Sequence, residues 1–565
     1  MSEVVSSTGY TYVTDYELTA VADMLRDTLG ISEPLTWPNG FSSAVSSLIS
    51  QSNDGKCGEW VAGTIREYAG QIRTVPSSFF SDCVMLESVN LPNCERVEKY
   101  AFYSCAALSS VNLPICKIIE SSAFCSCVAL SSIDLPTCKT IEGSAFYGCS
   151  TLTSISLPSC TSFQNSVFAY CESLKSISLP NCTTIGYGVF YNCYNLESVY
   201  APLCEKLDGY AFYFCKHVSS FSFPLCTNVG YSAFCYCEGL ESVYLPACKS
   251  IGAGAFYNCT KMSYINLPAC ITVEGNSFQQ CFSLASVNLP VCKIIGGNAF
   301  SYCNRLSCID LPSCQDVSYN AFYGCAMLSS VNLPVCLHVS QTAFGSCQNL
   351  ISIDLPSCLS IDAYAFRSCY SLTFVNAPSC QTIGSFAFAN CNSLTSVCFS
   401  ACSVIQGNAF NSCSSLTSID LPLCRSIYSS AFFNCYNLSQ VSLPICSFIA
   451  SSAFCSCSGL LSIELPSCSS INTSTFYACS SLKTVRLQSC KSIGTGAFAL
   501  CSALQSLYLL SGLVCSIADS GVFSGTPLIQ SSNGVYASIY VPSSLLQQYK
   551  TTTKWNYFSD RFVGI

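Results

Sequence analysis

Leu108–Cys127 reads LSSVNLPICKIIESSAFCSC, and this stretch decides the fold because the chain repeats its pattern every 22 residues. Phe followed three residues later by Cys occurs first at Phe80 and last at Phe498, which is 19 steps of 22 residues and hence 20 units. A second Cys column runs from Cys94 to Cys490 at the same step, with no insertion or deletion. A fixed period of this length predicts a solenoid of stacked coils.

Within one unit, apolar and polar side chains alternate as they do along a β-strand. Val111 and Leu113 alternate with Ser110 and Asn112, so one strand face is expected to be buried and the other open. The Pro that follows ends the strand because it cannot donate to the ladder. The Ala-Phe pair further on is expected to form a short helical or 3₁₀ turn on the opposite side of the coil. Stacking should bury equivalent side chains on one another, and the core is predicted to include Phe124, Cys127, Cys138, Phe146, Cys149, Phe234 and Cys237.

The unit also resembles a known repeat. Leu108–Cys116 follows L-x-x-V-x-L-x-x-C, which matches the leucine-rich repeat core. The extension I-x-x-x-A-F-x-x-C-x-x-L resembles the BspA-type, or Treponema-type, leucine-rich repeat found in proteins of gut Firmicutes and their phages and prophages. The resemblance covers roughly residues 71–510. It implies a leucine-rich-repeat solenoid, a right-handed β-solenoid or horseshoe-like arc, of about 20 coils with a helical N-terminal domain and an α/β C-terminal cap.

The ends depart from the repeat, and four segments are expected: an N-terminal helical segment at 1–52, a linker or cap at 53–75, the repeats at 76–510 and a C-terminal cap at 511–565. Apolar residues at helical spacing predict a helix over 15–29, and a second short helix is expected over 41–49. The helix–WPxGF–helix arrangement resembles a segment of tail-associated phage proteins of Firmicutes, where it would attach the protein to the virion. The alternative is a helical cap that shields the first coil.

The chain holds 46 Cys but only 2 His, and only 10% of its residues are charged, with a formal net charge of −8. The two columns account for 39 of the Cys, which favours a ladder of buried thiols. Disulfides between neighbouring coils and metal binding are the two alternatives. Cys308 and Cys398 fall at outward-facing strand positions and are predicted to be exposed. With so few His and no catalytic motif, the sequence predicts no enzyme, no cofactor and no metal site.

Two surfaces are candidates for binding. The open strand face carries Ser, Asn, Asp and Tyr, and its candidate residues are Asn112, Asp134, Tyr200, Tyr244, Asn266 and Asp310. A second candidate is an exposed aromatic stripe made by the residue after the repeated Phe, at Tyr103, Tyr147, Tyr191, Tyr213, Tyr257 and Tyr323. The alternatives are a solvated sheet face for the first set and packing between coils for the second.

These features favour recognition of a cell-surface protein or glycan. One hypothesis is a phage or prophage tail-associated receptor-binding or fibre-like protein; another is a bacterial surface adhesin, and a third is a self-assembling structural filament. The first residues show no secretory signal pattern, and the expected location is the virion tail or the extracellular surface. No membrane span is predicted. Because the chain has no basic stripe, nucleic acid is not an expected partner. A homo-oligomer would form through the N-terminal segment.

Overall fold

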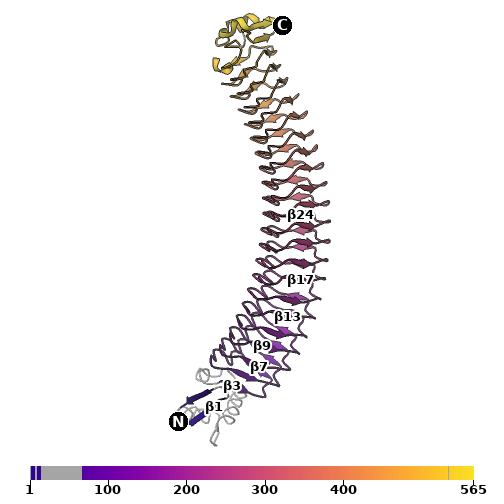
Figure 1. Cartoon of the computed structure of the whole chain (residues 1–565), viewed down its shortest axis with the longest axis vertical. Coiled ribbons are helices and arrows are strands. Elements are labelled where there is room, and N and C mark those ends of the chain that lie inside the picture. The colour runs from indigo at the N-terminus through magenta and orange to yellow at the C-terminus, as the bar shows by residue number, and fades with distance from the viewer. Residues whose placement is uncertain (1, 7–8, 14–65, 532–533) are drawn as a thin grey trace. The chain divides into compact units, whose positions relative to one another are not determined.

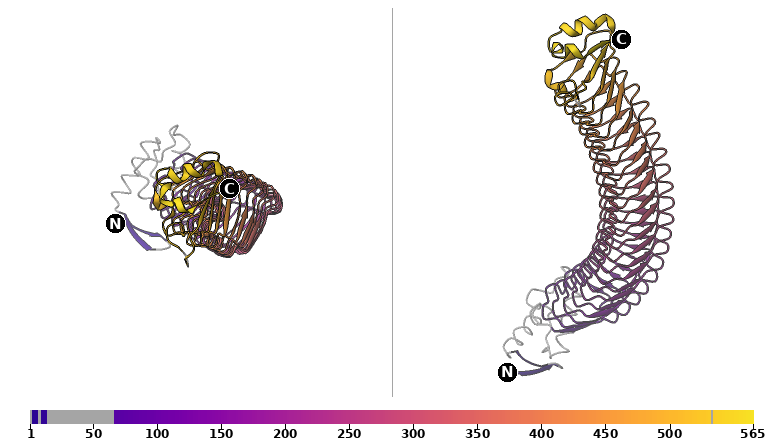
Figure 2. Two further views of the ribbon diagram at one scale, coloured as in Figure 1. Left: turned by 90° about the horizontal axis from the view of Figure 1, so that it is seen from above. Right: turned by 45° about the horizontal axis from the view of Figure 1, so that its top comes forward.

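The computed structural model describes residues 2–6, 9–13, 66–531 and 534–565 (Figure 1). The chain divides into two compact units, Met1–Val243 and Tyr244–Ile565. From residue 66 onward both are parallel-strand β-solenoids of the leucine-rich repeat type. Together they comprise about 23 turns of about 22 residues each. Within each unit the strands of successive coils lie one above the next (Figures 1 and 2).

Each coil contributes two strands, and each kind forms its own ladder. In the first unit the longer strands are β3 (Glu67–Ala69), β5 (Ser88–Asn90), β7 (Ser110–Asn112), β9 (Ser132–Asp134), β11 (Ser154–Ser156), β13 (Ser176–Ser178), β15 (Ser198–Tyr200) and β17 (Ser220–Ser222). The shorter strands are β4 (Thr74–Val75), β6 (Arg96–Val97), β8 (Ile118–Ile119), β10 (Thr140–Ile141), β12 (Ser162–Phe163), β14 (Thr184–Ile185), β16 (Lys206–Leu207) and β18 (Asn228–Val229). An antiparallel hairpin of β1 (Ser2–Ser6) and β2 (Gly9–Val13) precedes them in the chain.

The second unit repeats this plan, and the boundary between the units falls within β19 (Ser242–Tyr244). Its longer strands are β21 (Tyr264–Asn266), β23 (Ser286–Asn288), β25 (Cys308–Asp310), β27 (Ser330–Asn332), β29 (Ser352–Asp354), β31 (Phe374–Asn376), β33 (Ser396–Cys398), β35 (Ser418–Asp420), β37 (Gln440–Ser442), β39 (Ser462–Leu465), β41 (Thr484–Leu487) and β43 (Ser506–Leu509). Its shorter strands are β20 (Ser250–Ile251), β22 (Thr272–Val273), β24 (Ile294–Ile295), β26 (Asp316–Val317), β28 (His338–Val339), β30 (Ser360–Ile361), β32 (Thr382–Ile383), β34 (Val404–Ile405), β36 (Ser426–Ile427), β38 (Phe448–Ile449), β40 (Ser470–Ile471), β42 (Ser492–Ile493) and β44 (Ser516–Ile517).

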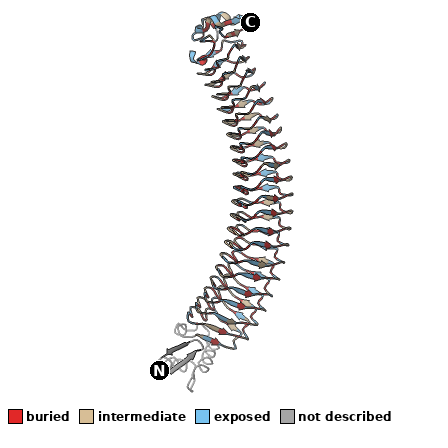
Figure 3. Ribbon diagram, viewed as in Figure 1, coloured by how far each residue is buried: buried red, intermediate tan, exposed pale blue. Residues whose placement is uncertain are grey.

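The strand register equals the sequence period. Ile155 of β11 pairs with Ile133 of β9, and Ser154 pairs with Ser132, so equivalent residues of neighbouring coils lie side by side. In β9 the central Ile133 is buried while its two neighbours are exposed, which is the predicted alternation of strand faces. Figure 3 shows buried and exposed residues following one another along the coils. The solenoid therefore buries one face of each strand inside the coil and leaves the other open.

The Ala-Phe segment forms consecutive turns in place of the predicted helical or 3₁₀ turn. Ser122 and Ser126 flank the pair in the left-handed region, with φ of 56° and 61°, and such residues cannot continue a helix. The turn extends its hydrogen bonds to the next coil: the N–H of Ser122 donates to Gly143 O at 3.0 Å, and that of Phe124 to Ala145 O at 2.8 Å. The N–H groups between them, those of Ala123 and Cys125, bond within the turn to Glu120 O and Ser122 O at 3.2 Å. Bonds within the turn thus alternate with bonds between coils, and no continuous helix forms.

The core consists of columns of identical side chains. The predicted core residues Phe124, Phe146 and Phe234, together with Cys127, Cys138, Cys149 and Cys237, are all fully buried. The ring of Phe124 stacks between Phe102 and Phe146, with centroid distances of 4.9 and 5.3 Å and nearly parallel planes. Within each unit, a continuous aromatic stack runs along the inside of the coils.

Both Cys columns are buried, and their thiols contact backbone carbonyls. Cys127 Sγ lies 3.1 Å from Phe102 O of the preceding coil, while Cys138 Sγ lies 3.4 Å from Thr140 O of its own coil. Each of the 45 described cysteines is buried except the exposed Cys308 and the half-buried Cys398.

The predicted helices over 15–29 and 41–49, with the WPxGF segment between them, lie outside the described residues. The hairpin of β1 and β2 was not predicted for the start of the chain. Strands β3 and β4 fall within 53–75, the predicted linker or cap, so the coils begin earlier than the repeated Phe indicates.

An α/β cap closes the C-terminal end, as predicted. It comprises β45 (Ser538–Val541), β46 (Phe562–Gly564), the helix α3 (Leu546–Thr551) and the 3₁₀ helices η1 (Ser520–Phe523), η2 (Ser543–Leu545) and η3 (Trp555–Arg561). Strands β45 and β46 extend the ladder of β43 in parallel. Across 2–6, 9–13, 66–531 and 534–565 we find no helix with the length and apolar character that a membrane crossing requires.

Candidate binding surface

Three of the six residues predicted on the open strand face are hydrogen-bonded to a side chain of a neighbouring coil. Four pairs lie on adjacent strands, each with an Asn Nδ2 at 2.7 Å from a carboxamide or carboxylate oxygen of the preceding coil: Asn112 with Asn90, Asn288 with Asn266, Asn332 with Asp310, and Asn376 with Asp354. Asn112, Asn266 and Asp310 therefore stabilise the sheet, and part of their hydrogen-bonding capacity is already used.

The other predicted residues of the open strand face stand free of this pairing. Tyr200 at the end of β15 and Tyr244 at the end of β19 are 60% and 57% exposed. Asp134 ends β9 and is also exposed. The open strand face thus presents these three side chains singly.

A second surface lies on the turns around the repeated Phe. We define the turn face as the residues three and two before, and one and two after, this Phe in each of the 20 coils, which is 80 positions. Only Asp82, Lys99 and Arg367 are charged among them, and Ser, Asn, Gly and Tyr predominate. A surface of this composition offers hydroxyl groups, amides and aromatic rings at low net charge.

The predicted aromatic stripe lies on the turn face but is interrupted. Cys125, Ala169 and Cys235 occupy the same position as the predicted tyrosines in intervening coils, and all three are buried. Near the start of the solenoid, the ring of Tyr103 packs against the ring of Tyr100 in the same coil, with a centroid distance of 5.7 Å. Tyr257 occupies this position in the coil of Phe256. The tyrosines are therefore gathered in clusters and do not form a continuous stripe.

One cluster in the first unit lines a hollow of about 420 Å³, which we call the aromatic groove. Six rings from four coils surround it: Tyr147, Tyr170, Tyr187, Tyr191, Tyr210 and Tyr213. Tyr191 stacks on Tyr213 with a centroid distance of 4.8 Å, and Tyr170 lies between Tyr147 and Tyr191 at 5.2 and 5.6 Å. The predicted stripe contributes Tyr147, Tyr191 and Tyr213 to this groove.

Sequence reasoning missed Tyr170, Tyr187 and Tyr210. They stand at other positions of the turn face, two after, three before and two before the repeated Phe, so a search along one column does not find them. Aligning all four positions over neighbouring coils would have shown the concentration of tyrosines between Tyr147 and Tyr236.

Glycines make room for the rings. Gly188 lines the aromatic groove with φ of 59°, a conformation that glycine adopts without strain. A Cβ on Gly209 would come within 2.7 Å of Tyr231 Cε1, so the ring of Tyr231 rests directly on the backbone there. Tyr231 in turn contacts Tyr210 at 5.1 Å and extends the aromatic surface by one coil.

The groove is electrically neutral. Partial burial raises the pKa of Tyr213 to about 12 because it disfavours the phenolate, and burial likewise raises the pKa of Tyr191 and Tyr147. All residues that line the groove are uncharged, and Lys216, which does not line it, has its Nζ in an ion pair with Glu238 at 3.0 Å. The groove therefore offers protonated phenols and ring faces, which suit a neutral ligand.

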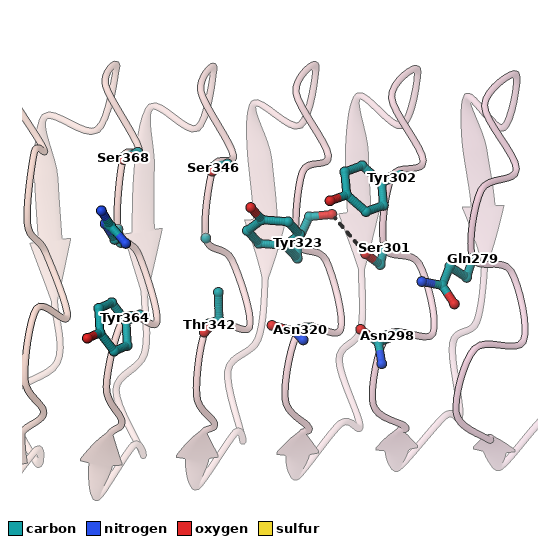
Figure 4. A pocket seen from close by; sticks show the side chains of 12 residues that line it. Gln279, Asn298, Ser301, Tyr302, Asn320, Tyr323, Thr342, Ser346, Tyr364 and Ser368 are labelled. Atoms are coloured by element: carbon teal, nitrogen blue, oxygen red, sulfur yellow. Dashed lines mark hydrogen bonds between the residues drawn. The ribbon is translucent and has the colours of Figure 1, made fainter.

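The second unit has its own hollow on the turn face, of about 600 Å³, which we call the polar groove (Figure 4). It spans the coils of Phe278 to Phe366. One row holds the residues two before the repeated Phe, namely Asn298, Asn320, Thr342 and Tyr364. A second row holds the residues one after it, namely Gln279, Ser301, Tyr323, Gly345 and Arg367. Of the predicted stripe, only Tyr323 lies here.

One pair of side chains has the residue types of a hydrolase. His338 Nδ1 lies 3.1 Å from Ser360 Oγ on adjacent short strands, and Asp316 is the strand partner of His338 on the other side. No hydrogen bond or ion pair joins Asp316 to the His338 ring; these two residues are exposed and Ser360 is half-buried. Among the residues that the structure describes, no three His, Cys, Asp or Glu side chains gather as metal ligands.

A family model supports the repeat assignment. The model described as "BspA type Leucine rich repeat region (6 copies)" matches residues 73–197, 227–349, 272–379, 337–448 and 425–535, which is well over half of the 565 residues. Among curated proteins none matches the chain significantly.

The chain is also similar to solved leucine-rich repeat structures. A protein from Bacteroides ovatus is 26% identical over 51% of this chain and 86% of its own, with a TM-score of 0.39. One from T. pallidum is 28% identical over 27% of this chain and 78% of its own, with a TM-score of 0.26. A leucine rich cell surface protein from Faecalibacterium prausnitzii is 18% identical over 66% of this chain and 89% of its own, with a TM-score of 0.27.

Proposed function

The chain belongs to the BspA-type leucine-rich repeat family, and from that premise we propose that it is a non-enzymatic recognition protein whose turn face binds a cell-surface glycan or protein. The aromatic groove is the observation that carries this proposal. Six tyrosine rings line a hollow of about 420 Å³ on a surface that is otherwise almost uncharged. Tyr supplies a large rigid contact area and a hydroxyl at low entropic cost, which is why it dominates binding surfaces.

The experiment compares the two candidate surfaces. Fluorescently labelled full-length protein would be applied to a panel of Firmicutes cells and measured by flow cytometry. Tyr191→Ala with Tyr213→Ala removes the stacked pair of the aromatic groove, and we expect at least a tenfold loss of cell binding. Tyr200→Ala removes an exposed ring of the open strand face and serves as the matched control, because it should leave binding unchanged.

The outcomes separate the surfaces. If Tyr200→Ala abolishes binding while the double variant retains it, the open strand face is the binding surface and the turn face is not. If the wild-type protein binds no cells in the panel, the recognition function itself is contradicted. Matched melting curves for all variants would show that lost binding is not lost folding.

We further propose a place for the protein on a phage or prophage tail. The support is the resemblance of residues 1–52 to an attachment segment of tail-associated proteins. Immunogold labelling of phage particles induced from the producing strain should then place the chain on tails, and deletion of 1–52 should remove it. Labelling confined to the bacterial surface would favour an adhesin, and labelled ropes without particles would favour a filament.

A further inference from the structure

The polar groove of the second unit differs in chemistry from the aromatic groove. Its lining combines three tyrosines with amides and hydroxyl groups, and Arg367 is its single charged residue. Arg367 is also the only charged residue found one position after the repeated Phe in any of the 20 coils. This substitution in an otherwise neutral column points to a specific ligand chemistry.

Small residues create the hollow. Gly345 stands between Tyr323 and Arg367 in the same row, so the floor has no side chain there. The rings of Tyr302 and Tyr323 meet edge to face with a centroid distance of 5.5 Å (Figure 4). In the last coil of the groove, the Arg367 guanidinium lies 5.6 Å from the centre of the Tyr364 ring. Tyr323 and Arg367 are two coils apart, on the order of 10 Å at the strand spacing.

The backbone under the groove has no free donors for a peptide strand. The N–H of Tyr302 donates to Tyr323 O at 2.8 Å, that of Gly324 to Gly345 O at 2.9 Å, and that of Ser346 to Arg367 O at 2.8 Å. Binding by strand addition needs unpaired backbone groups, so the geometry disfavours an extended peptide.

The groups that remain available for hydrogen bonds and ion pairs with a ligand are side chains. Within the described part of the chain, the side-chain amides of Asn298 and Asn320 form no hydrogen bond, and the Arg367 guanidinium forms no ion pair. A ligand that satisfies dispersed amides and hydroxyl groups while covering ring faces must carry many hydroxyls around an apolar ring edge. Pyranose sugars have this chemistry, and aromatic side chains pack against their C–H faces.

We propose that the polar groove binds an acidic saccharide of two or three units, with a sugar ring against Tyr302 and Tyr323 and a sugar carboxylate on Arg367. Charge complementarity favours an acidic sugar. No carboxylate is among the lining residues to pair with the Arg367 guanidinium, and a guanidinium binds a ligand carboxylate through two parallel hydrogen bonds. This site goes beyond the proposed function, which depends on the aromatic groove of the other unit.

The test is calorimetric titration of the full-length protein with trigalacturonate and 3′-sialyllactose, alongside the neutral maltotriose and lactose. At least one acidic probe should bind, and at least tenfold more tightly than its neutral counterpart. Arg367→Gln should remove this preference, and Arg367→Lys should restore part of it. Arg305→Gln is the control, because it removes the same charge from an exposed position off the turn face.

A second variant fills the groove without challenging the fold. Ser346 has φ of 60°, and Tyr302 occupies the equivalent position with φ of 62°, so the backbone accepts Tyr there. Ser346→Tyr should therefore keep the wild-type melting curve and lose acidic-saccharide binding at least tenfold.

Three results would overturn the site: no binding of either acidic probe, equal binding of acidic and neutral probes, or equal losses in Arg367→Gln and Arg305→Gln. The last would indicate nonspecific charge attraction. The Tyr191→Ala, Tyr213→Ala variant should bind the acidic probe as the wild type does. If the polar groove binds no acidic saccharide, the cell-binding test of the aromatic groove is therefore unaffected.

Discussion

At the residue scale, the Cys columns combine small volume with a weak donor. Cys127 fills a fully buried position and places its Sγ 3.1 Å from a backbone carbonyl of the preceding coil. Ala would fit the volume but leave this contact unmade, and a larger apolar residue would clash in a tightly packed interior. The column thus reflects what each coil needs at one point of its core, repeated along the chain.

The aromatic stack gives the first prediction. Phe124→Ala removes a fully buried ring from between Phe102 and Phe146 and leaves a cavity, so we expect a loss of about 3–5 kcal/mol in unfolding free energy. Chemical denaturation followed by circular dichroism measures this loss. Tyr200→Ala, at an exposed position, should change stability by less than about 0.5 kcal/mol. A denaturation curve for Phe124→Ala that overlays the wild type would contradict its place in the core.

Thiol reactivity provides the second prediction. Burial raises the pKa of Cys325 and of Cys369 to about 12, so at pH 8 only about one thiol in 10⁴ at these positions is the reactive thiolate. Brief treatment of the native protein with iodoacetamide should label Cys308 first and Cys398 more slowly, as peptide mass spectrometry would show. Unfolded protein, as the control, should be labelled throughout. Native labelling of Cys325 at the rate of Cys308 would refute the buried ladder.

At the scale of elements, strands of two to four residues are too short to be stable alone. Their stability comes from pairing with equivalent strands above and below, so each coil depends on its neighbours. The end of the ladder therefore needs a cover. Trp555 is fully buried there, packs against Phe523 at a centroid distance of 5.9 Å, and donates its indole N–H to Cys515 O.

The cap gives the third prediction. Trp555→Ala should destabilise the C-terminal coils first. Each coil is stabilised by its interfaces with its immediate neighbours, so the effect of losing the cap should decrease with distance along the array. Hydrogen–deuterium exchange should accelerate in β43 and β45, while β21 and β23 keep their wild-type protection. Tyr557→Ala is the control, since this side chain is 77% exposed. Uniform acceleration throughout the second unit would show instead that the unit unfolds as a whole.

The sequence predicts the elements far better than the candidate grooves. The period determines which residues pair, because Ile133 and Ile155 are one unit apart, and the alternation around them identifies the buried face. The turn was mispredicted because every second N–H bonds to the next coil, beyond any local pattern, and so no continuous helix forms. The grooves depend on which residue lies beside which across several coils, such as Gly345 between Tyr323 and Arg367, and one column alone does not contain that information.

At the scale of the whole molecule, the buried thiols couple stability to pH, which is the fourth prediction. Unfolded thiols have a pKa near 8.5, whereas burial raises the pKa of Cys138 and Cys182 to about 11. Below the unfolded value both states are protonated and the contribution to stability is complete. Above it the unfolded chain loses protons that the folded chain keeps, so each such thiol costs about 1.4 kcal/mol per pH unit.

Thermal melts at pH 8, 9 and 10 should therefore show a steep fall in Tm, much larger than a protein with few cysteines would show. The loss should continue until the pH reaches the raised pKa of the folded thiols. Replacing Cys325, Cys347 and Cys369 with Ala should lower stability at pH 8 but make the fall with pH shallower. A Tm that stays constant from pH 8 to 10 would contradict this coupling.

The uninterrupted 22-residue register has a consequence for inheritance. A recombination event that gains or loses one full unit joins Ile to Ile and Phe to Phe, so the ladders and stacks close again and the fold survives. The same event inside the coils of Phe146 to Phe212 or of Phe278 to Phe366 changes which side chains stand beside one another and remakes a groove. Variants that differ in coil number would therefore share a fold and diverge in what they recognise.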